Sequence, residues 1–206
     1  MVNMMKKDNR DHSIIVYETW KRGFDTIFCL IALFFAIPII ITFCIAIMIE
    51  SPGSCFYTQK RIGKNLRYFT IYKLRSMYKD SEQHGAIWAE KEDPRVTRVG
   101  KIMRKTRIDE LPQLINILKN DMSVIGPRPE RPEFVKEFNK DIPGYKERFH
   151  VKSGLTGLAQ VEGGYELTPQ EKLEKDIYYI KNRSFWLDFI IMLKTVVVVL
   201  TGKGAR

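Results

Sequence analysis

The chain has 206 residues, 45% of them hydrophobic, which is enough for one ordinary domain with a real core plus a short appendage. Its 34 lysines and arginines outnumber 24 aspartates and glutamates, and this excess indicates an anionic partner: nucleic acid, acidic lipid or a phosphorylated substrate. The three cysteines have neither the pattern of a disulfide framework nor metal-ligand spacing, so they exclude both a disulfide-stapled fold and a cysteine-based metal site.

Residues 26–49 contain no charged side chain over 24 positions, whereas a membrane helix needs about 20 apolar residues. The run is too long and starts too late for a cleavable signal peptide. Pro38 lies at its centre and removes a backbone donor. Lysine and arginine, which mark cytoplasmic flanks, occur on both sides: Lys6, Lys7, Arg10, Lys21 and Arg22 before the run, and Lys60, Arg61, Lys64 and Arg67 after it. The residues leave two interpretations open, a kinked spanning helix or a helix that breaks at Pro38 and leaves by the same face.

Two further segments mix apolar and charged residues. Residues 12–25 precede the apolar run and carry aromatic side chains typical of the headgroup level. Residues 185–200 are apolar but contain Asp188 and Lys194, so they favour a helix on the membrane interface or in the core over a second span.

The remaining chain predicts an α/β fold that is mostly helical. Residues 55–77 alternate around a Gly-Lys-Asn turn and predict a β-hairpin, and residues 80–95 predict a loop. Residues 98–120 have helical spacing. Thr168 begins a capping box followed by proline, which predicts a helix to about Lys181.

Two adjacent carboxylates, Asp109 and Glu110, lie in the most basic part of the chain. One interpretation is structural, because acidic residues are favoured near helix N-termini. The other is chemical: neighbouring positive charge favours the ionised carboxylate, which can be a nucleophile or a Mg²⁺ ligand. Adjacent helical residues point roughly 100° apart, so the two would have separate tasks.

Basic residues near this pair suit phosphoryl transfer, which depends on positioning and on neutralising phosphate charge. The candidate phosphate-binding residues are Arg104, Arg128, Lys73, Arg95 and Arg98.

Several motifs in order resemble the bacterial sugar transferase family, the monotopic polyprenyl-phosphate phosphoglycosyl transferases. They are "KRGFD", the central proline, "YKLRSM", "DPRVTRVGKIMRKTRIDELPQL", "NDMSVIGPRP" and "GLTGLAQV". The similarity runs from about Lys21 to Gly204 and looks like the minimal catalytic form, without the additional N-terminal membrane domain of larger members.

The resemblance implies a ping-pong reaction. The aspartate matching Asp109 attacks the sugar-bearing phosphate of a UDP-sugar and releases UMP, and polyprenyl (undecaprenyl) phosphate then takes the phosphosugar, the first membrane step of envelope glycoconjugate or exopolysaccharide synthesis. By the same resemblance Glu110 assists, Mg²⁺ binds at Asp109, and Arg104 and Arg128 hold phosphates.

The resemblance also favours a re-entrant helix broken at Pro38 (residues 1–50), followed by a compact cytoplasmic catalytic domain (residues 51–206) with interfacial amphipathic helices. It places the protein at the cytoplasmic face of a bacterial inner membrane. Three departures concern Ile37, where some members have serine, Ser153, where proline is common, and Glu162 with Gly164, where "NGR" is frequent. The last departure removes an arginine near the expected sugar pocket, so the family pattern does not indicate which sugar is transferred.

Two alternatives lack this chemistry. A membrane-tethered module that binds nucleic acid or acidic lipid would explain the charge but not the acidic pair, and no RNA-stacking motif is present; no nucleic-acid partner is therefore expected. A scaffold that has lost activity is opposed by the intact "DELPQ" and "GPRP". The oligomeric state is open, a homodimer included.

Overall fold

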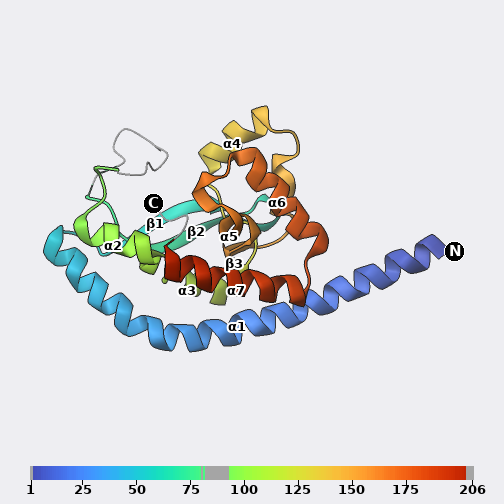
Figure 1. Cartoon of the computed structure of the whole chain (residues 1–206), viewed down its shortest axis with the longest axis horizontal. Helices are drawn as coiled ribbons and strands as arrows, with labels where there is room; N and C mark the ends of the chain where they lie inside the picture. The colour runs from blue at the N-terminus through green and yellow to red at the C-terminus, as the bar shows by residue number, and fades with distance from the viewer. Residues whose placement is uncertain (1, 80, 82–92, 203–206) are drawn as a thin grey trace.

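The computed structural model describes residues 2–79, 81 and 93–202, so most of the loop expected over residues 80–95 lies outside the described residues. The fold is mostly helical α/β with small sheets, as the sequence predicts (Figure 1). The α-helices are α1 (Val2–Glu50), α2 (Arg98–Thr106), α3 (Gln113–Leu118), α4 (Pro132–Asp141), α5 (Leu158–Glu162), α6 (Pro169–Asn182) and α7 (Phe185–Thr201). The strands are β1 (Phe56–Ile62), β2 (Tyr68–Leu74), β3 (Met122–Ile125) and β4 (Ser153–Thr156). Short 3-10 turns are η1 (Lys64–Leu66), η2 (Ile108–Glu110), η3 (Tyr145–His150) and η4 (Gly164–Glu166).

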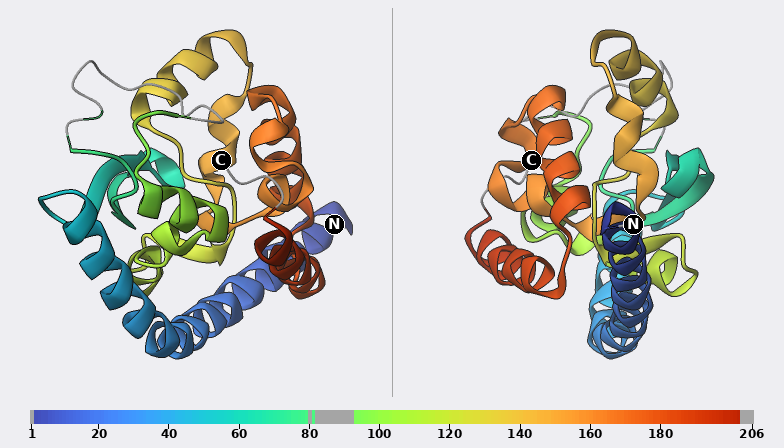
Figure 2. Two further views of the ribbon diagram at one scale, coloured as in Figure 1. Left: turned by 60° about the vertical axis from the view of Figure 1, so that its left-hand side comes forward. Right: turned by 90° about the vertical axis from the view of Figure 1, so that its right-hand side faces the viewer.

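Helix α1 runs beneath the rest of the protein (Figure 1). It is helical through Pro38, so the expected break is not an interruption of the secondary structure. A proline removes only its own backbone donor, and the turns on either side can continue while the axis bends. Figure 2 (left) shows the helix changing direction about midway along its length.

The "KRGFD" segment anchors α1 to the domain above it. Lys21 Nζ lies 2.5 Å from the Asp188 carboxylate in α7. Arg22 donates to the carbonyl oxygens of Ile117 and Leu118 at the end of α3, where a cation meets the negative end of the helix dipole. These two charges from the membrane flank therefore have partners inside the protein.

Asp188 is one of the two charges, with Lys194, that make residues 185–200 a poor candidate for a second span. Its carboxylate accepts hydrogen bonds from Tyr17 at 2.7 Å and Tyr179 at 2.9 Å, besides the contact with Lys21. The Asp188 carboxylate thus joins α1, α6 and α7. Several apolar side chains of α7, Trp186 and Leu200 among them, are exposed. The predicted helix over this segment is confirmed.

The predicted hairpin is also confirmed. Strands β1 and β2 pair antiparallel, with Phe56 opposite Leu74 and Ile62 opposite Tyr68. Asn116 of α3 fixes the hairpin against the helices: its amide donates to the Thr70 carbonyl at 2.7 Å, and its carbonyl accepts from Tyr72 N at 3.1 Å.

A parallel pair, β3 and β4, lies at the centre, with Met122 opposite Ser153. The glycines of "IGPRP" and "GLTG" let two backbones touch, because a Cβ at Gly154 would lie 2.1 Å from Gly126 N. Beyond it, the predicted capping box at Thr168 caps α6, which ends at Asn182. A core cluster joins β1, α4, η3 and α6 through Ile62, Val135, Tyr145, Phe149 and Leu173.

Candidate active site

A cavity of about 760 Å³ opens between the hairpin, the turn after α2, the Arg128 loop and η4. We call it the central pocket. Among its described lining residues, ten arginines and lysines face three carboxylates, Asp109, Glu110 and Glu130. This imbalance suits an anionic ligand.

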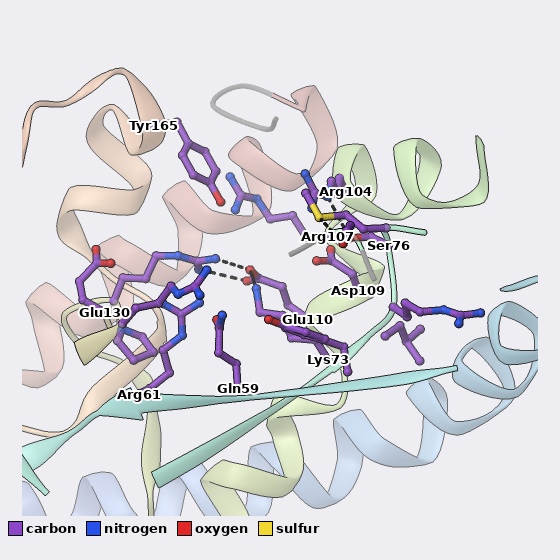
Figure 3. Close-up of a pocket in the computed structure, with 18 of the residues that line it drawn as sticks. Gln59, Arg61, Lys73, Ser76, Arg104, Arg107, Asp109, Glu110, Glu130 and Tyr165 are labelled. Atoms are coloured by element: carbon purple, nitrogen blue, oxygen red, sulfur yellow. Dashed lines mark hydrogen bonds and ion pairs between the residues drawn. The ribbon is translucent and has the colours of Figure 1, made fainter. Parts of the chain in front are cut away.

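The acidic pair is placed by a tight turn between α2 and η2. Arg107 has a left-handed φ of 58°, which costs roughly 1 kcal/mol for a residue with a side chain. Its backbone N–H donates to the carbonyls of Met103 and Arg104, closing α2. The chain then turns directly into η2, where Asp109 and Glu110 are 8% and 7% exposed. Figure 3 shows the two carboxylates entering the pocket from this turn.

Glu110 is held firmly by two of the predicted cations. Lys73 of β2 donates to its carboxylate at 2.9 Å, and Arg128 contacts both carboxylate oxygens, one of them at 3.2 Å. Burial alone would raise the pKa of Glu110, but the charges of Arg128 and Lys73 outweigh burial and hold the pKa well below its usual range. Glu110 is therefore an ionised linker that positions Lys73 and Arg128 (Figure 3).

Asp109 differs from its neighbour. No hydrogen bond or ion pair among the described residues engages its carboxylate. Burial raises the pKa of Asp109 to about 6, the charge of Lys73 opposes this, and the negative charge of Glu110 reinforces it. The sequence-based expectation that nearby cations favour the ionised form is therefore confirmed for Glu110 and wrong in direction for Asp109, where desolvation is the larger effect.

The structure brings only some of the predicted cations together. Lys73, Arg104 and Arg128 line the central pocket, and Arg104 Nε donates to Ser76 Oγ at 2.9 Å. Arg95 and Arg98 are absent from the described lining. Arg95 instead pairs with Asp93 at 2.5 Å, and Arg98 is an exposed residue at the start of α2. Closeness in sequence to Asp109 and Glu110 therefore does not distinguish the cations that line the pocket from those that do not.

The sequence-based prediction of the pocket leaves out many of its lining residues, including Arg61, Arg107, Arg148 and Tyr165. In the sequence, Arg61 belongs to the basic residues that follow the apolar run, but its alternation with Gln59 along β1 places both on one face of the strand, toward the pocket. Tyr165 follows Gly164, at the position where the family pattern departs, and its ring points into the pocket (Figure 3). The charge of Arg128, which outweighs burial, lowers the pKa of Tyr165.

The expected Mg²⁺ site consists of a single protein carboxylate. Within the described part of the chain, no group of three histidines, cysteines, aspartates or glutamates could hold a metal. Mg²⁺ commonly takes one or two carboxylates and completes its shell with water and substrate phosphate. Asp109 fits this role, because its carboxylate is buried at the pocket and lacks a partner in the described structure, whereas Glu110 is already paired.

Comparison with known proteins places the chain in a family. The family profile described as bacterial sugar transferase matches residues 16–202. UDP-N-acetylgalactosamine-undecaprenyl-phosphate N-acetylgalactosaminephosphotransferase of Aeromonas hydrophila is 50% identical over 194 residues, which cover 93% of this chain and 46% of that protein. The chain thus spans about half the length of this relative.

Two further relatives are covered more fully. UDP-glucose:undecaprenyl-phosphate glucose-1-phosphate transferase of Caulobacter vibrioides is 39% identical over 93% of this chain and 73% of its own length. Exopolysaccharide production protein PSS of Rhizobium leguminosarum is 39% identical over 89% of this chain and 97% of its own length. With a profile match over nearly its whole length, and the acidic pair, the arginine loop and the hairpin lysine gathered at one pocket, the chain belongs to the bacterial sugar transferase family.

Proposed function

We propose that this protein transfers a sugar 1-phosphate from a UDP-sugar to undecaprenyl phosphate, releasing UMP, as the first membrane step of polysaccharide synthesis. The observation that carries the proposal is the asymmetry of the acidic pair: Glu110 is fixed by Lys73 and Arg128, while Asp109 is unengaged in the described structure and faces a cation-lined cavity. A buried carboxylate beside phosphate-binding cations is equipped to attack phosphorus.

In the first half-reaction, a carboxylate oxygen of Asp109 attacks the sugar-bearing phosphorus of the donor. A bond forms between Asp109 and phosphorus, the bond from phosphorus to the bridging oxygen breaks, and the electron pair leaves with UMP. Lys73, Arg104 and Arg128 surround this point and offset the negative charge on the phosphate oxygens. Glu110 keeps Lys73 and Arg128 in place without competing as nucleophile, because its own oxygens are occupied.

In the second half-reaction, an oxygen of undecaprenyl phosphate attacks the same phosphorus. The bond to Asp109 breaks, its electron pair returns to the carboxylate, and undecaprenyl-diphosphate-sugar is released. This ping-pong sequence lets a soluble donor and a membrane acceptor use one nucleophile in turn. Mg²⁺ bound at Asp109 would supply further neutralisation of phosphate charge.

The membrane arrangement is proposed from α1. Ser13–Glu50 is long and apolar enough to cross a membrane, and 17% of its most apolar stretch is buried in the protein. Its exposed apolar side chains, Phe34 at 75% and Phe35 at 66% among them, need a lipid environment. The midway change of direction (Figure 2) supports a re-entrant path that keeps both ends at the cytoplasmic face. Residues 1–50 would then form the membrane part and residues 51–206 the cytoplasmic domain, with α7 at the interface.

The donor sugar is proposed from the names of two relatives. The 50% identical relative is named for N-acetylgalactosamine phosphate transfer, and the 39% identical Caulobacter relative for glucose phosphate transfer. UDP-N-acetylgalactosamine is therefore the first donor to test and UDP-glucose the second. The purified protein, in detergent with Mg²⁺ and undecaprenyl phosphate, should release UMP and form a lipid-diphosphate sugar. A protein that releases no UMP with any UDP-sugar would instead be a scaffold.

The raised pKa of Asp109 predicts an acid limb in the pH profile. Because the attacking group is the carboxylate, kcat/KM for the donor should fall about tenfold per pH unit below a pKa of about 6, and level off above it. Initial rates between pH 5 and 8 at low donor concentration measure this limb. A profile that stays flat down to pH 5 would show that the ionisation of Asp109 does not limit the free enzyme.

A further inference from the structure

Arg61 is a cation of the central pocket that the protein leaves without a partner in the described structure. Its Nε is buried and makes no hydrogen bond, and no side-chain hydrogen bond or ion pair between described residues includes Arg61. Arg75, Arg95 and Arg148 also have one buried unpaired nitrogen, but each donates its other N–H groups to oxygen. Arg61 is thus a guanidinium aimed into a cavity with its donors unused (Figure 3).

The nearby carboxylates do not neutralise Arg61. Glu110 is engaged by Lys73 and Arg128, and Glu130 lies 3.7 Å from Arg148. Burial, together with the positive charges of Arg128 and Arg131, lowers the pKa of Arg61, with Glu130 opposing. Like charges held together in a partly buried site are costly unless an anion joins them. This side of the pocket is therefore built to receive a negative ligand.

Arg128 connects this side to the nucleophile. The positive charge of Arg128 lowers the pKa of both Asp109 and Arg61. Arg128 is bound to Glu110, which lies between Asp109 and Arg61 in Figure 3. Adjacent phosphates of a diphosphate share one oxygen. With the sugar-bearing phosphate at Asp109, a neighbouring phosphate on the Arg128 side would also meet Arg61.

In-line displacement at the transferred phosphorus means that two different phosphates occupy the position opposite Asp109 in turn. Attacking and leaving oxygens lie roughly in line at the transferred phosphorus. In the first half-reaction Asp109 attacks, so the phosphate of UMP departs from the opposite side. In the second, Asp109 is the leaving group, so the acceptor oxygen must enter from that same side. The departing and the entering phosphate therefore use one position.

We propose that Arg61, with Arg128, binds the phosphate monoester opposite Asp109: the phosphate of UMP in one half-reaction and that of the polyprenyl acceptor in the other. This inference rests on the proposed function. It makes Arg61 a substrate-binding residue of both half-reactions.

The test separates phosphate binding from the other steps. Wild-type and Arg61→Gln proteins are loaded with phosphosugar from the UDP-sugar, freed of excess donor, and mixed with UMP, with undecaprenyl phosphate or with buffer alone. At subsaturating ligand, Arg61→Gln should react about 10- to 100-fold more slowly with both phosphates, as expected for a lost charged hydrogen bond. Hydrolysis of the adduct in buffer should be unchanged, because water brings no phosphate. Arg61→Lys, which keeps the charge, should recover part of both rates.

Lys60→Gln is the matched control, because Lys60 is the neighbouring exposed cation on β1 and is absent from the described pocket lining. It should match wild type in every arm. Unchanged rates in Arg61→Gln, slowing with only one phosphate, or faster or slower hydrolysis in buffer would each overturn the shared position. A wild-type protein that forms no adduct would overturn the proposed mechanism instead, so the two failures are distinguishable.

Discussion

Asp109→Asn should lower the rate of sugar-1-phosphate transfer by about 1,000-fold or more, as is usual when a covalent nucleophile is removed. The amide has nearly the same shape but no ionised oxygen, so no bond to phosphorus can form. UMP release at saturating donor and acceptor measures the loss. Asp141→Asn makes the same change at an exposed carboxylate at the end of α4 and should leave the rate unchanged.

This loss should occur without loss of folding. The pKa of Asp109 is raised from 3.8 to about 6 in the folded protein, so folding favours its protonated form. Stability from this group is therefore complete at low pH and declines as pH rises from about 4 through 6. Asparagine cannot ionise, so at pH 7 the variant should melt at the same temperature as wild type or higher. A variant that is inactive because it is unfolded, or one that stays active, would contradict the role given to Asp109.

Arg148→Met should destabilise the protein by about 3–5 kcal/mol, the usual cost of removing one partner of a buried ion pair. Arg148 is 1% exposed and lies 2.7 Å from Asp176 of α6. It also donates to the Arg128 carbonyl at 3.1 Å, which fixes the loop that carries Arg128 to Glu110. The change would leave the Asp176 carboxylate buried beside an apolar side chain. Thermal unfolding in detergent measures the effect.

Two further variants test the origin of this effect. Arg67→Met removes an exposed arginine just before β2 and should leave the melting temperature near that of wild type. The double variant Arg148→Met/Asp176→Leu removes both buried charges and should recover much of the loss. An Arg148→Met protein as stable as wild type would show that the ion pair does not hold the arginine loop in place.

Local patterns in the sequence were sufficient for several elements. The alternation of residues 55–77, the capping box at Thr168 and the apolar run each depend on neighbouring residues alone, and each gives the element it predicts. The grouping of Asp109 with Lys73, Arg104 and Arg128 followed from the motifs, and the structure gathers these residues at one pocket.

Long-range features could not be obtained in this way. The partner of Lys21 is 167 positions away in α7, so the "KRGFD" motif alone does not indicate that its charged residues bind partners inside the protein. The raised pKa of Asp109 depends on burial beneath several elements, whereas its basic sequence neighbours indicated the opposite. Arg95 pairs with Asp93, two residues away, and the basic pattern of the motif does not indicate this partner.

Intact-protein mass spectrometry can detect the covalent phosphosugar intermediate on Asp109 itself. The purified protein is incubated with Mg²⁺ and UDP-N-acetylgalactosamine or UDP-glucose without lipid acceptor. We expect a mass gain of one phosphosugar, which should be absent from Asp109→Asn, present in Asp141→Asn, and cleared by undecaprenyl phosphate. UMP release that depends on undecaprenyl phosphate, with no adduct at any time after mixing, would contradict it and indicate direct transfer from donor to lipid.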